Sequence, residues 1–334
     1  MIIQLKPRIT ASDKEAILAR LSAIGYKATE VHTQKAFYMV CIGKNEFDLR
    51  LIGSLPGVED VHRVSESYKL VSRKWKVGES GIDLGDGVHI GNGVFSLMAG
   101  PCSIESEEQV RSVAKHLAGN NIRIMRGGVF KPRSSPYAFR GMGLEGLKMF
   151  SSVCREHGIK IVTEVMQVSQ ISEMLDYVDV FQVGARNSQN FNLLDELGRV
   201  DKPILLKRGM SGTVDELLQS AEYIFSAGNE RLMLCERGIR SYETAYRNTF
   251  DVNAIAVLKE KSHLPVIADP SHGIGLREHV PAIALAATAA GADGVIYEVH
   301  EKPEEALSDA QQTLNFSESA QMIEKVRRLK ELLT

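Results

Sequence analysis

Charged and polar side chains follow each of eight apolar runs in the second part of the chain. Many of them are arginines and lysines. Cations gathered in one pocket repel one another and lose hydration, and an anionic ligand is the simplest compensation. A phosphate ester carries a charge of about −2 at neutral pH. If the runs converge, they therefore predict a pocket for more than one anionic group, with the cations Arg126, Lys131, Arg133, Arg186, Lys207 and Arg237.

A second group of these residues has the side chains that ligate metals. Cys102, His272 and Glu298 follow the first, seventh and eighth runs, and Asp309 lies in the loop after the eighth. Thiolate, imidazole and carboxylate are ligands for divalent transition metals. Because the residues come from distant segments, spacing alone leaves a second interpretation open, in which a buried cysteine accompanies three hydrogen-bonded polar residues.

The apolar runs alternate with helix-like segments. Eight such units in about 240 residues predict an α/β fold of the (β/α)8 TIM-barrel type, in which the carboxyl ends of all strands meet at one mouth. A doubly wound open sheet is the alternative, but none of the apolar runs in this sequence is followed by a glycine-rich dinucleotide-binding motif. The expected strands lie within 94–100, 122–128, 159–165, 180–185, 203–209, 231–238, 265–270 and 294–300.

Residues 1–65 have a different pattern. Strands near 2–5, 27–33, 36–42 and 58–64, with helices over 12–26 and 45–55, give the order βαββαβ of a small ferredoxin-like α+β domain. The polar stretch 66–81 is expected to be a linker, and 82–334 the barrel domain. Apolar residues on both sides of Asp86-Gly87 predict a hairpin at the start of the barrel.

The composition of the 334 residues excludes several classes of protein. With 44% hydrophobic residues and a formal charge of −2, the chain is neither disordered nor built to bind nucleic acid or an acidic membrane surface. The longest apolar stretch, 283–290, is too short to span a bilayer. Four widely separated cysteines lack C-x-x-C spacing, which favours a reducing, cytoplasmic location.

Several segments together resemble 3-deoxy-D-arabino-heptulosonate 7-phosphate (DAHP) synthase, of the type I β group with a fused N-terminal ferredoxin-like domain. They are Gly100-Pro-Cys-Ser, the stretch from Arg126 to Phe139, Val183-Gly-Ala-Arg-Asn, Leu205-Leu-Lys-Arg-Gly, Leu234-Cys-Glu-Arg-Gly-Ile-Arg and Asp269-Pro-Ser-His-Gly. The resemblance implies a transferase that condenses phosphoenolpyruvate (PEP) with D-erythrose 4-phosphate and releases phosphate. This reaction opens the shikimate pathway to the aromatic amino acids.

The related 3-deoxy-D-manno-octulosonate 8-phosphate (KDO8P) synthases use arabinose 5-phosphate and are the alternative. The Lys131-Pro132-Arg133 segment resembles the enzymes that use the four-carbon sugar. One departure is Ser134, where many DAHP synthases have threonine; the hydroxyl is retained.

The resemblance also implies a role for each site residue. The divalent metal ion, expected to be Mn2+ with Fe2+, Co2+ or Zn2+ as alternatives, would be held by Cys102, His272, Glu298 and Asp309. Glu164 and Lys131 would be catalytic, and Arg133 and Ser134 would bind the phosphate of erythrose 4-phosphate. The PEP site would comprise Arg126, Lys131, Ala185, Arg186, Lys207 and Arg237.

Two interpretations of residues 1–65 remain. The domain is either an allosteric module that binds an aromatic amino acid, giving feedback inhibition by Tyr or Phe, or a structural and oligomerisation module. His32 and Thr33, at the end of an expected strand, are candidates for the effector site. The family further implies a homo-oligomer, expected to be a tetramer.

Overall fold

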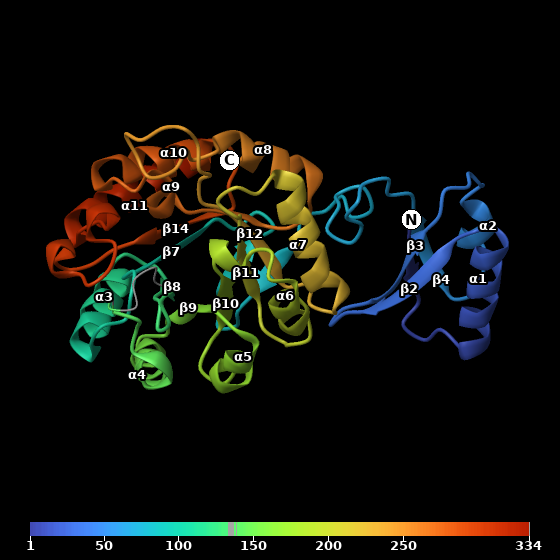
Figure 1. The fold of residues 1–334 in the computed structure, drawn as a ribbon, viewed down its shortest axis with the longest axis horizontal. Coiled ribbons are helices and arrows are strands. Elements are labelled where there is room, and N and C mark those ends of the chain that lie inside the picture. Colours follow the sequence, from blue (N-terminus) through green and yellow to red (C-terminus); the bar gives the residue numbers. More distant parts are fainter. Residues whose placement is uncertain (133–136, 138, 334) are drawn as a thin grey trace.

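A computed structural model describes residues 1–132, 137 and 139–333. A small N-terminal part lies beside a larger barrel (Figure 1). The small part has the order β1 (Ile2–Leu5), α1 (Ala11–Ala23), β2 (Lys27–His32), β3 (Phe37–Ile42), α2 (Arg50–Gly53) and β4 (Val58–His62). Its strands pair antiparallel in the order β2-β3-β1-β4, which confirms the predicted βαββαβ arrangement.

The second helix of this small part is much shorter than expected. Only Arg50–Gly53 is helical, so the prediction of a helix over 45–55 is wrong for most of its length. The carboxylate of Asp48 accepts a hydrogen bond from the backbone N–H of Arg50 at 3.0 Å. Such local bonds from an aspartate compete with helical hydrogen bonding, so the helix begins only after Asp48.

Eight parallel strands close into a barrel, which confirms the (β/α)8 prediction against the open sheet. Their order around the barrel is β10-β11-β12-β13-β14-β7-β8-β9, so β14 pairs with β7 and closes the ring. Each predicted apolar run contains one of these strands. They are β7 (Ser96–Gly100), β8 (Ile124–Arg126), β9 (Lys160–Val165), β10 (Val180–Val183), β11 (Ile204–Lys207), β12 (Leu232–Glu236), β13 (Val266–Ala268) and β14 (Gly294–Glu298).

Helices surround the strands and bury their apolar faces against them, as Leu218 and Ile224 of α7 do. In the part of the chain that the structure describes, no helix is long and apolar enough to cross a membrane. The helices are α3 (Glu107–Gly119), α4 (Gly143–Glu156), α5 (Val168–Met174), α6 (Phe191–Gly198), α7 (Val214–Ser226), α8 (Val252–Lys261), α9 (Pro270–Ile274), α10 (Val280–Ala289) and α11 (Phe316–Leu333), with short 3-10 turns η1 (Ala185–Asn187), η2 (Arg277–His279), η3 (Pro303–Glu305) and η4 (Ala310–Gln312).

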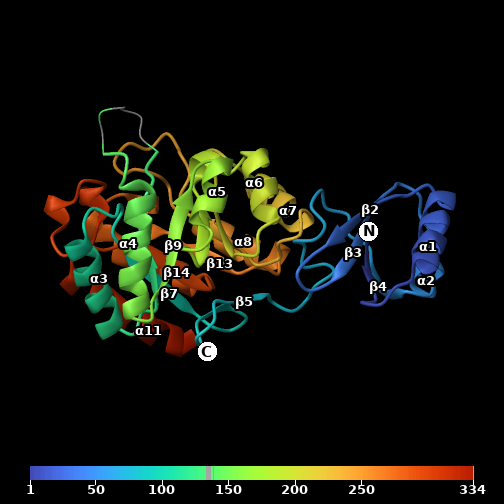
Figure 2. The same ribbon diagram turned by 90° about the horizontal axis from the view of Figure 1, so that it is seen from below.

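A hairpin packs against the N-terminal end of the barrel. It pairs β5 (Gly81–Asp83) with β6 (His89–Gly91) antiparallel. Asp86 and Gly87 have φ angles of 54° and 74°, the left-handed conformation for which an Asp-Gly turn is suited. Ile82, Val88 and Ile90 form one buried cluster with side chains of the barrel strands. In Figure 2, β5 lies at the end of the barrel opposite the upper loops.

The segment expected to be a polar linker is packed against the barrel. Tyr68, Leu70, Val71 and Trp75 are all buried in the same core cluster as the barrel helices. The carboxylate of Glu222 on α7 accepts hydrogen bonds from the backbone N–H groups of Leu70 (2.9 Å) and Val71 (3.1 Å). Apolar residues scattered among charged ones therefore join the two parts of the chain through a common core.

Candidate active site

A cavity lies at the mouth formed by the carboxyl ends of the barrel strands. The empty space in it, including its open mouth, measures about 690 Å³. Nine of the predicted site residues line it, namely Arg126, Lys131, Glu164, Ala185, Arg186, Lys207, Arg237, His272 and Asp309. Cys102 and Glu298 contact members of this set from buried positions. Arg133 and Ser134, expected to bind the sugar phosphate, lie outside the described residues.

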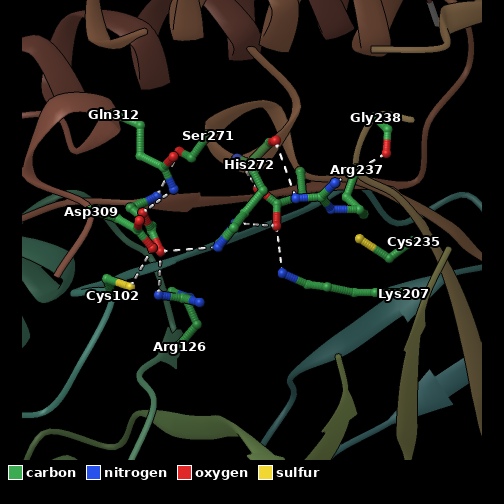
Figure 3. Close-up of polar contacts among 12 residues, drawn as sticks. Cys102, Arg126, Lys207, Cys235, Arg237, Gly238, Ser271, His272, Asp309 and Gln312 are labelled. Atoms are coloured by element: carbon green, nitrogen blue, oxygen red, sulfur yellow. Dashed lines mark hydrogen bonds and ion pairs between the residues drawn. The ribbon is translucent and has the colours of Figure 1, made fainter. Parts of the chain in front are cut away.

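The four predicted metal ligands come together. Ligand atoms of Cys102, Glu298 and Asp309 lie within 4.8 Å of one another, and Cys102 Sγ is 3.1 Å from Asp309 Oδ2. His272 Nε2 is 3.5 Å from Glu298 Oε1. Glu298 is the last residue of β14 and Cys102 lies two residues after β7, so adjacent strands place them side by side. Figure 3 shows Cys102, His272 and Asp309 turned toward one centre.

The charges of this cluster are unusual for buried groups. Burial, with the nearby Glu298 carboxylate, raises the pKa of the Cys102 thiol to about 12. Burial would also raise the pKa values of the two carboxyls. His272 and Arg126 outweigh it at Glu298 and lower that pKa, and His272 with Cys102 lowers the pKa of Asp309 to about 2. Two carboxylates are therefore ionised beside a thiol that keeps its proton.

This donor set fits a divalent metal ion. One sulfur, one imidazole nitrogen and two carboxylates are a mixture that Mn2+, Fe2+, Co2+ and Zn2+ accept. A bound cation would stabilise the thiolate form of Cys102, which burial alone disfavours. Asp309 also has a left-handed backbone, with φ 50° and ψ 34°. Strained conformations of this kind in residues other than glycine are concentrated at functional sites.

Three pocket cations already have partners. Arg126 Nη1 donates to Glu298 Oε1 at 3.0 Å, and Lys131 Nζ lies 3.0 Å from Cys102 Sγ. Burial would lower the pKa of Lys131, but the Cys102 sulfur and the carboxylates of Glu298 and Glu164 together outweigh burial and raise it. Lys207 Nζ is 2.5 Å from the carboxylate of Asp269.

Arg186 and Arg237 differ from these three. Among the described residues, neither forms an ion pair with a carboxylate. Arg237 is 4% exposed and donates to the carbonyl oxygens of Gly238 (3.1 Å) and His272 (3.3 Å). Burial lowers its pKa. A guanidinium without a carboxylate partner in a buried pocket is suited to bind an anionic group of a ligand.

Glu164 owes its position to a glycine. It lies on β9, and Gly184 follows the adjacent strand β10. A Cβ atom on Gly184 would lie 2.0 Å from Glu164 Oε1, so any larger residue there would push this carboxylate out of its present position. Ala185, whose backbone N–H was expected to bind substrate, follows Gly184 and begins η1.

Two residues at strand ends form a structural pair instead of joining the pocket. Arg208 Nη1 donates to Glu236 Oε2 at 2.8 Å and to Asp251 Oδ2 at 2.9 Å, and Glu236 is completely buried. The positive charge of Arg208 is thus neutralised within the protein.

Three residues of the site, Asp269, Gln312 and Arg247, were given no role by the sequence analysis, although Asp269 stood in a motif that it quoted. Asp269 contacts both Lys207 and His272. Gln312 donates from Nε2 to Glu298 Oε2 at 2.7 Å and accepts from Arg247 Nη1 at 2.6 Å. Only Asp269 carried a sequence signal, because an aspartate three residues before a histidine at a helix start is a typical N-cap.

The two candidate effector residues lie far from this pocket, where the small sheet meets the barrel. The His32 side chain is half exposed and its Nε2 is 3.2 Å from Glu30 Oε2. The Thr33 hydroxyl donates to Glu230, which lies in the turn before β12 of the barrel. The structure thus does not bring His32 and Thr33 to the active-site mouth.

Comparisons with known proteins agree with this geometry. The model of the DAHP synthetase I family matches residues 72–334. A phospho-2-dehydro-3-deoxyheptonate aldolase from Thermotoga maritima is 41% identical over 334 residues, covering 100% of this chain and 98% of its own. A 2-dehydro-3-deoxyphosphooctonate aldolase from Coxiella burnetii is 33% identical over 257 residues, covering 71% of this chain and 90% of its own.

Solved structures extend the likeness to three dimensions. The crystal structure of the T. maritima DAHP synthase covers 99% of this chain and 97% of its own, with a TM-score of 0.80 and 41% identity. A truncated form of that enzyme covers 80% of this chain and 98% of its own, with a TM-score of 0.75 and 42% identity. With a family model that spans the barrel and a relative similar over the whole length, the chain belongs to the DAHP synthetase I family.

Proposed function

We propose that the protein is a DAHP synthase, which condenses PEP with erythrose 4-phosphate to DAHP and phosphate. One observation carries the proposal. Among the described residues, the mouth of the barrel combines two arginines that have no carboxylate partner with a cluster of cysteine, histidine, glutamate and aspartate. Anionic substrates and a polarised carbonyl group are what this condensation needs. The four cysteines are free thiols, which supports a location in the reducing cytoplasm. The reaction would serve aromatic amino acid biosynthesis.

PEP is held by the cations of the cavity. Arg186 and Arg237 bind an anionic group through charge-assisted hydrogen bonds, and Lys207 and Arg126 contribute from the buried side. The backbone N–H of Ala185 is a further donor. Fixing PEP at several points places its C3 atom in register with the incoming aldehyde and lowers the entropic part of the barrier.

The aldehyde is activated beside the cluster of predicted metal ligands. A divalent ion held by Cys102, His272, Glu298 and Asp309 would supply Lewis-acid polarisation of the aldehyde oxygen. Lys131 Nζ, 3.0 Å from Cys102 Sγ, lies at the edge of this cluster. It can donate a proton to the alkoxide oxygen that forms when C3 of PEP attacks the aldehyde carbon.

Water completes the reaction at C2 of PEP. Positive charge develops at C2 after C3 forms its new bond. Glu164, which lines the cavity on the β9 side, orients a water molecule and takes its proton as the oxygen adds to C2. The resulting hemiketal phosphate then loses inorganic phosphate as its C–O bond breaks.

The identity of the acceptor sugar can be tested directly by an activity assay. We assign erythrose 4-phosphate because of the Lys131-Pro132-Arg133-Ser134 segment, in which Arg133 and Ser134 would bind the sugar phosphate. Phosphate release from PEP should be fast with erythrose 4-phosphate and negligible with arabinose 5-phosphate. The opposite preference would make the protein a KDO8P synthase and would overturn the assignment.

We further propose that residues 1–65 make the enzyme sensitive to an aromatic amino acid, and that it assembles as a homotetramer. His32 and Thr33 are the proposed effector contacts. Their place at the junction with the barrel supports the idea, because a ligand there would compete with Glu230 for the Thr33 hydroxyl. Such competition would alter the contact between the two parts of the chain.

Two truncated proteins separate regulation from stability. A protein that begins near Ser65 keeps Leu70, Val71 and Trp75 on the barrel, and it should retain turnover while losing inhibition by Tyr or Phe. One that begins at Ile82 lacks these buried side chains and should be less stable. Inhibition of the first truncated protein would place the effector site in the barrel. A full-length enzyme that ignores Tyr, Phe and Trp would make residues 1–65 a structural module.

A further inference from the structure

One buried carboxylate touches both halves of the active site. Asp269 follows β13 and is 1% exposed. Its Oδ2 atom accepts hydrogen bonds from Lys207 Nζ (2.5 Å) and from His272 Nδ1 (2.8 Å), and Oδ1 accepts one from the backbone N–H of His272 (3.0 Å). In Figure 3, His272 lies between Lys207 on one side and Cys102 with Asp309 on the other.

The hydrogen bonds define which nitrogen of His272 carries the proton. The Lys207 ammonium and the backbone N–H of His272 both donate to the two oxygen atoms of Asp269, which favours the ionised form of this carboxyl group. The carboxylate is ionised and can only accept, so Nδ1 of His272 is the donor. In neutral His272 the lone pair is therefore on Nε2, the atom that faces Glu298 Oε1 at 3.5 Å.

We propose that Asp269 is a positioning residue that couples the two halves of the pocket, since it orients His272 toward the metal-ligand cluster and holds Lys207 at the PEP subsite. The inference deepens the proposed function and rests on it. It predicts that PEP and the metal ion each strengthen the binding of the other through this side chain.

The coupling follows from the shared oxygen atom. When an anionic group of PEP contacts Lys207, the ammonium group interacts partly with PEP and less strongly with Asp269. The carboxylate then interacts more strongly with the N–H of His272, which makes the opposite nitrogen a better ligand. Linkage requires the effect to be equal in the reverse direction, so the metal ion must tighten PEP binding by the same factor.

Asp269→Asn tests this in the full-length protein. Asparagine has the same size as aspartate, and its amide oxygen can still accept a hydrogen bond from the His272 backbone. It has no charge, and its amide nitrogen cannot accept the hydrogen bonds that Lys207 and the His272 ring donate to Oδ2 of Asp269. The dissociation constant of Mn2+ from the metal-stripped protein is measured with and without PEP, from the electron paramagnetic resonance signal of free Mn2+. We expect PEP to tighten Mn2+ binding in the wild type by about 5-fold or more.

In Asp269→Asn, we expect Mn2+ binding without PEP to weaken about 10–100-fold. The effect of PEP on Mn2+ binding should also be clearly smaller than in the wild type. A variant that binds Mn2+ as tightly as the wild type, or that keeps the full effect of PEP, would overturn the proposal.

Asp293→Asn is the matched control. Asp293 is also buried, with 9% exposure, and it accepts from Lys259 Nζ (2.8 Å) and from the backbone N–H of Val266 (2.8 Å). It directly precedes the neighbouring strand β14 and contacts the first residue of β13, at the end of the barrel opposite the mouth. Mn2+ and PEP binding should therefore not change even if thermal stability falls. Equal weakening of Mn2+ binding in both variants would refute a specific role for Asp269. If the wild type did not consume PEP and erythrose 4-phosphate, the proposed function would be refuted instead. The comparison of Mn2+ binding by the wild type and Asp269→Asn without PEP would then still test whether Asp269 orients His272.

Discussion

His263 makes the stability of the protein depend on pH. Its ring is completely buried beneath residues 66–81. Nε2 donates to the carbonyl oxygen of Leu70 at 2.8 Å, so Nδ1 accepts from the Ser80 hydroxyl at 2.9 Å. Trp75 packs edge-on to the ring, with 5.7 Å between centroids. A second proton on the ring would displace the hydrogen bond that the Ser80 hydroxyl donates to Nδ1 and would place a positive charge in this buried site. Burial first, and the nearby Lys76 second, lower the pKa of His263 to about 3.

The size of the effect follows from the two pKa values. In the unfolded chain the pKa is about 6.5. Between these values the unfolded state binds a proton that the folded state does not, so the free energy of unfolding decreases as the pH falls. The loss is about 1.4 kcal/mol for each pH unit below 6.5 and amounts to about 2 kcal/mol at pH 5. It stops growing below pH 3.

The variant His263→Gln removes the titrating group and keeps an N–H that can donate to Leu70. Urea unfolding at pH 7.5 and pH 5 measures the free energy of unfolding of both proteins. The wild type should lose about 2 kcal/mol more than the variant between the two pH values. The exposed His157, changed to Gln, is the control and should keep the wild-type pH dependence. An equal loss in wild type and His263→Gln would refute the reasoning.

Three further predictions concern the active site. EDTA should abolish turnover and Mn2+ should restore it, and Cys102→Ala should lose both Mn2+ binding and activity; full turnover of the chelated enzyme would contradict a metal requirement. Arg237→Ala should raise the KM for PEP by roughly 10–100-fold, because a charge-assisted hydrogen bond is worth about 1.5–3 kcal/mol; steady-state kinetics with an unchanged KM would exclude Arg237 from the PEP site. Arg133→Ala should raise the KM for erythrose 4-phosphate far more than that for PEP, and equal changes would argue against a sugar-phosphate contact.

The sequence was sufficient to predict the barrel, and with the family resemblance it indicated which residues gather at the mouth of the barrel. Each apolar run ends in a polar residue, and a closed barrel brings all these ends to one mouth whatever their separation in the chain. This is why Cys102 and Asp309, 207 positions apart, were predicted to be neighbours and are 3.1 Å apart.

The remaining features depend on tertiary partners that no local pattern reveals. Gln312 belongs to the site because its side chain donates a hydrogen bond to Glu298. Glu236 does not line the pocket because its carboxylate is paired with Arg208. Residues 66–81 were interpreted as a linker from their many charges. Trp75 and its apolar neighbours are buried only because α7 and the strand β3 supply surfaces for them, as the contact of Trp75 with Tyr38 shows.

The hairpin β5–β6 has a consequence for the movement of molecules through the enzyme. Ile82, Val88 and Ile90 fill the N-terminal end of the barrel together with inward side chains such as Met98 and Met233. Among the described residues, the barrel axis is therefore a blind passage that opens at the carboxyl ends of the strands. Both substrates, water and both products must use the same entrance. Lys207 and Arg126 are each 4% exposed, so a molecule bound to them lies deep in the passage and exchanges with solvent through the mouth.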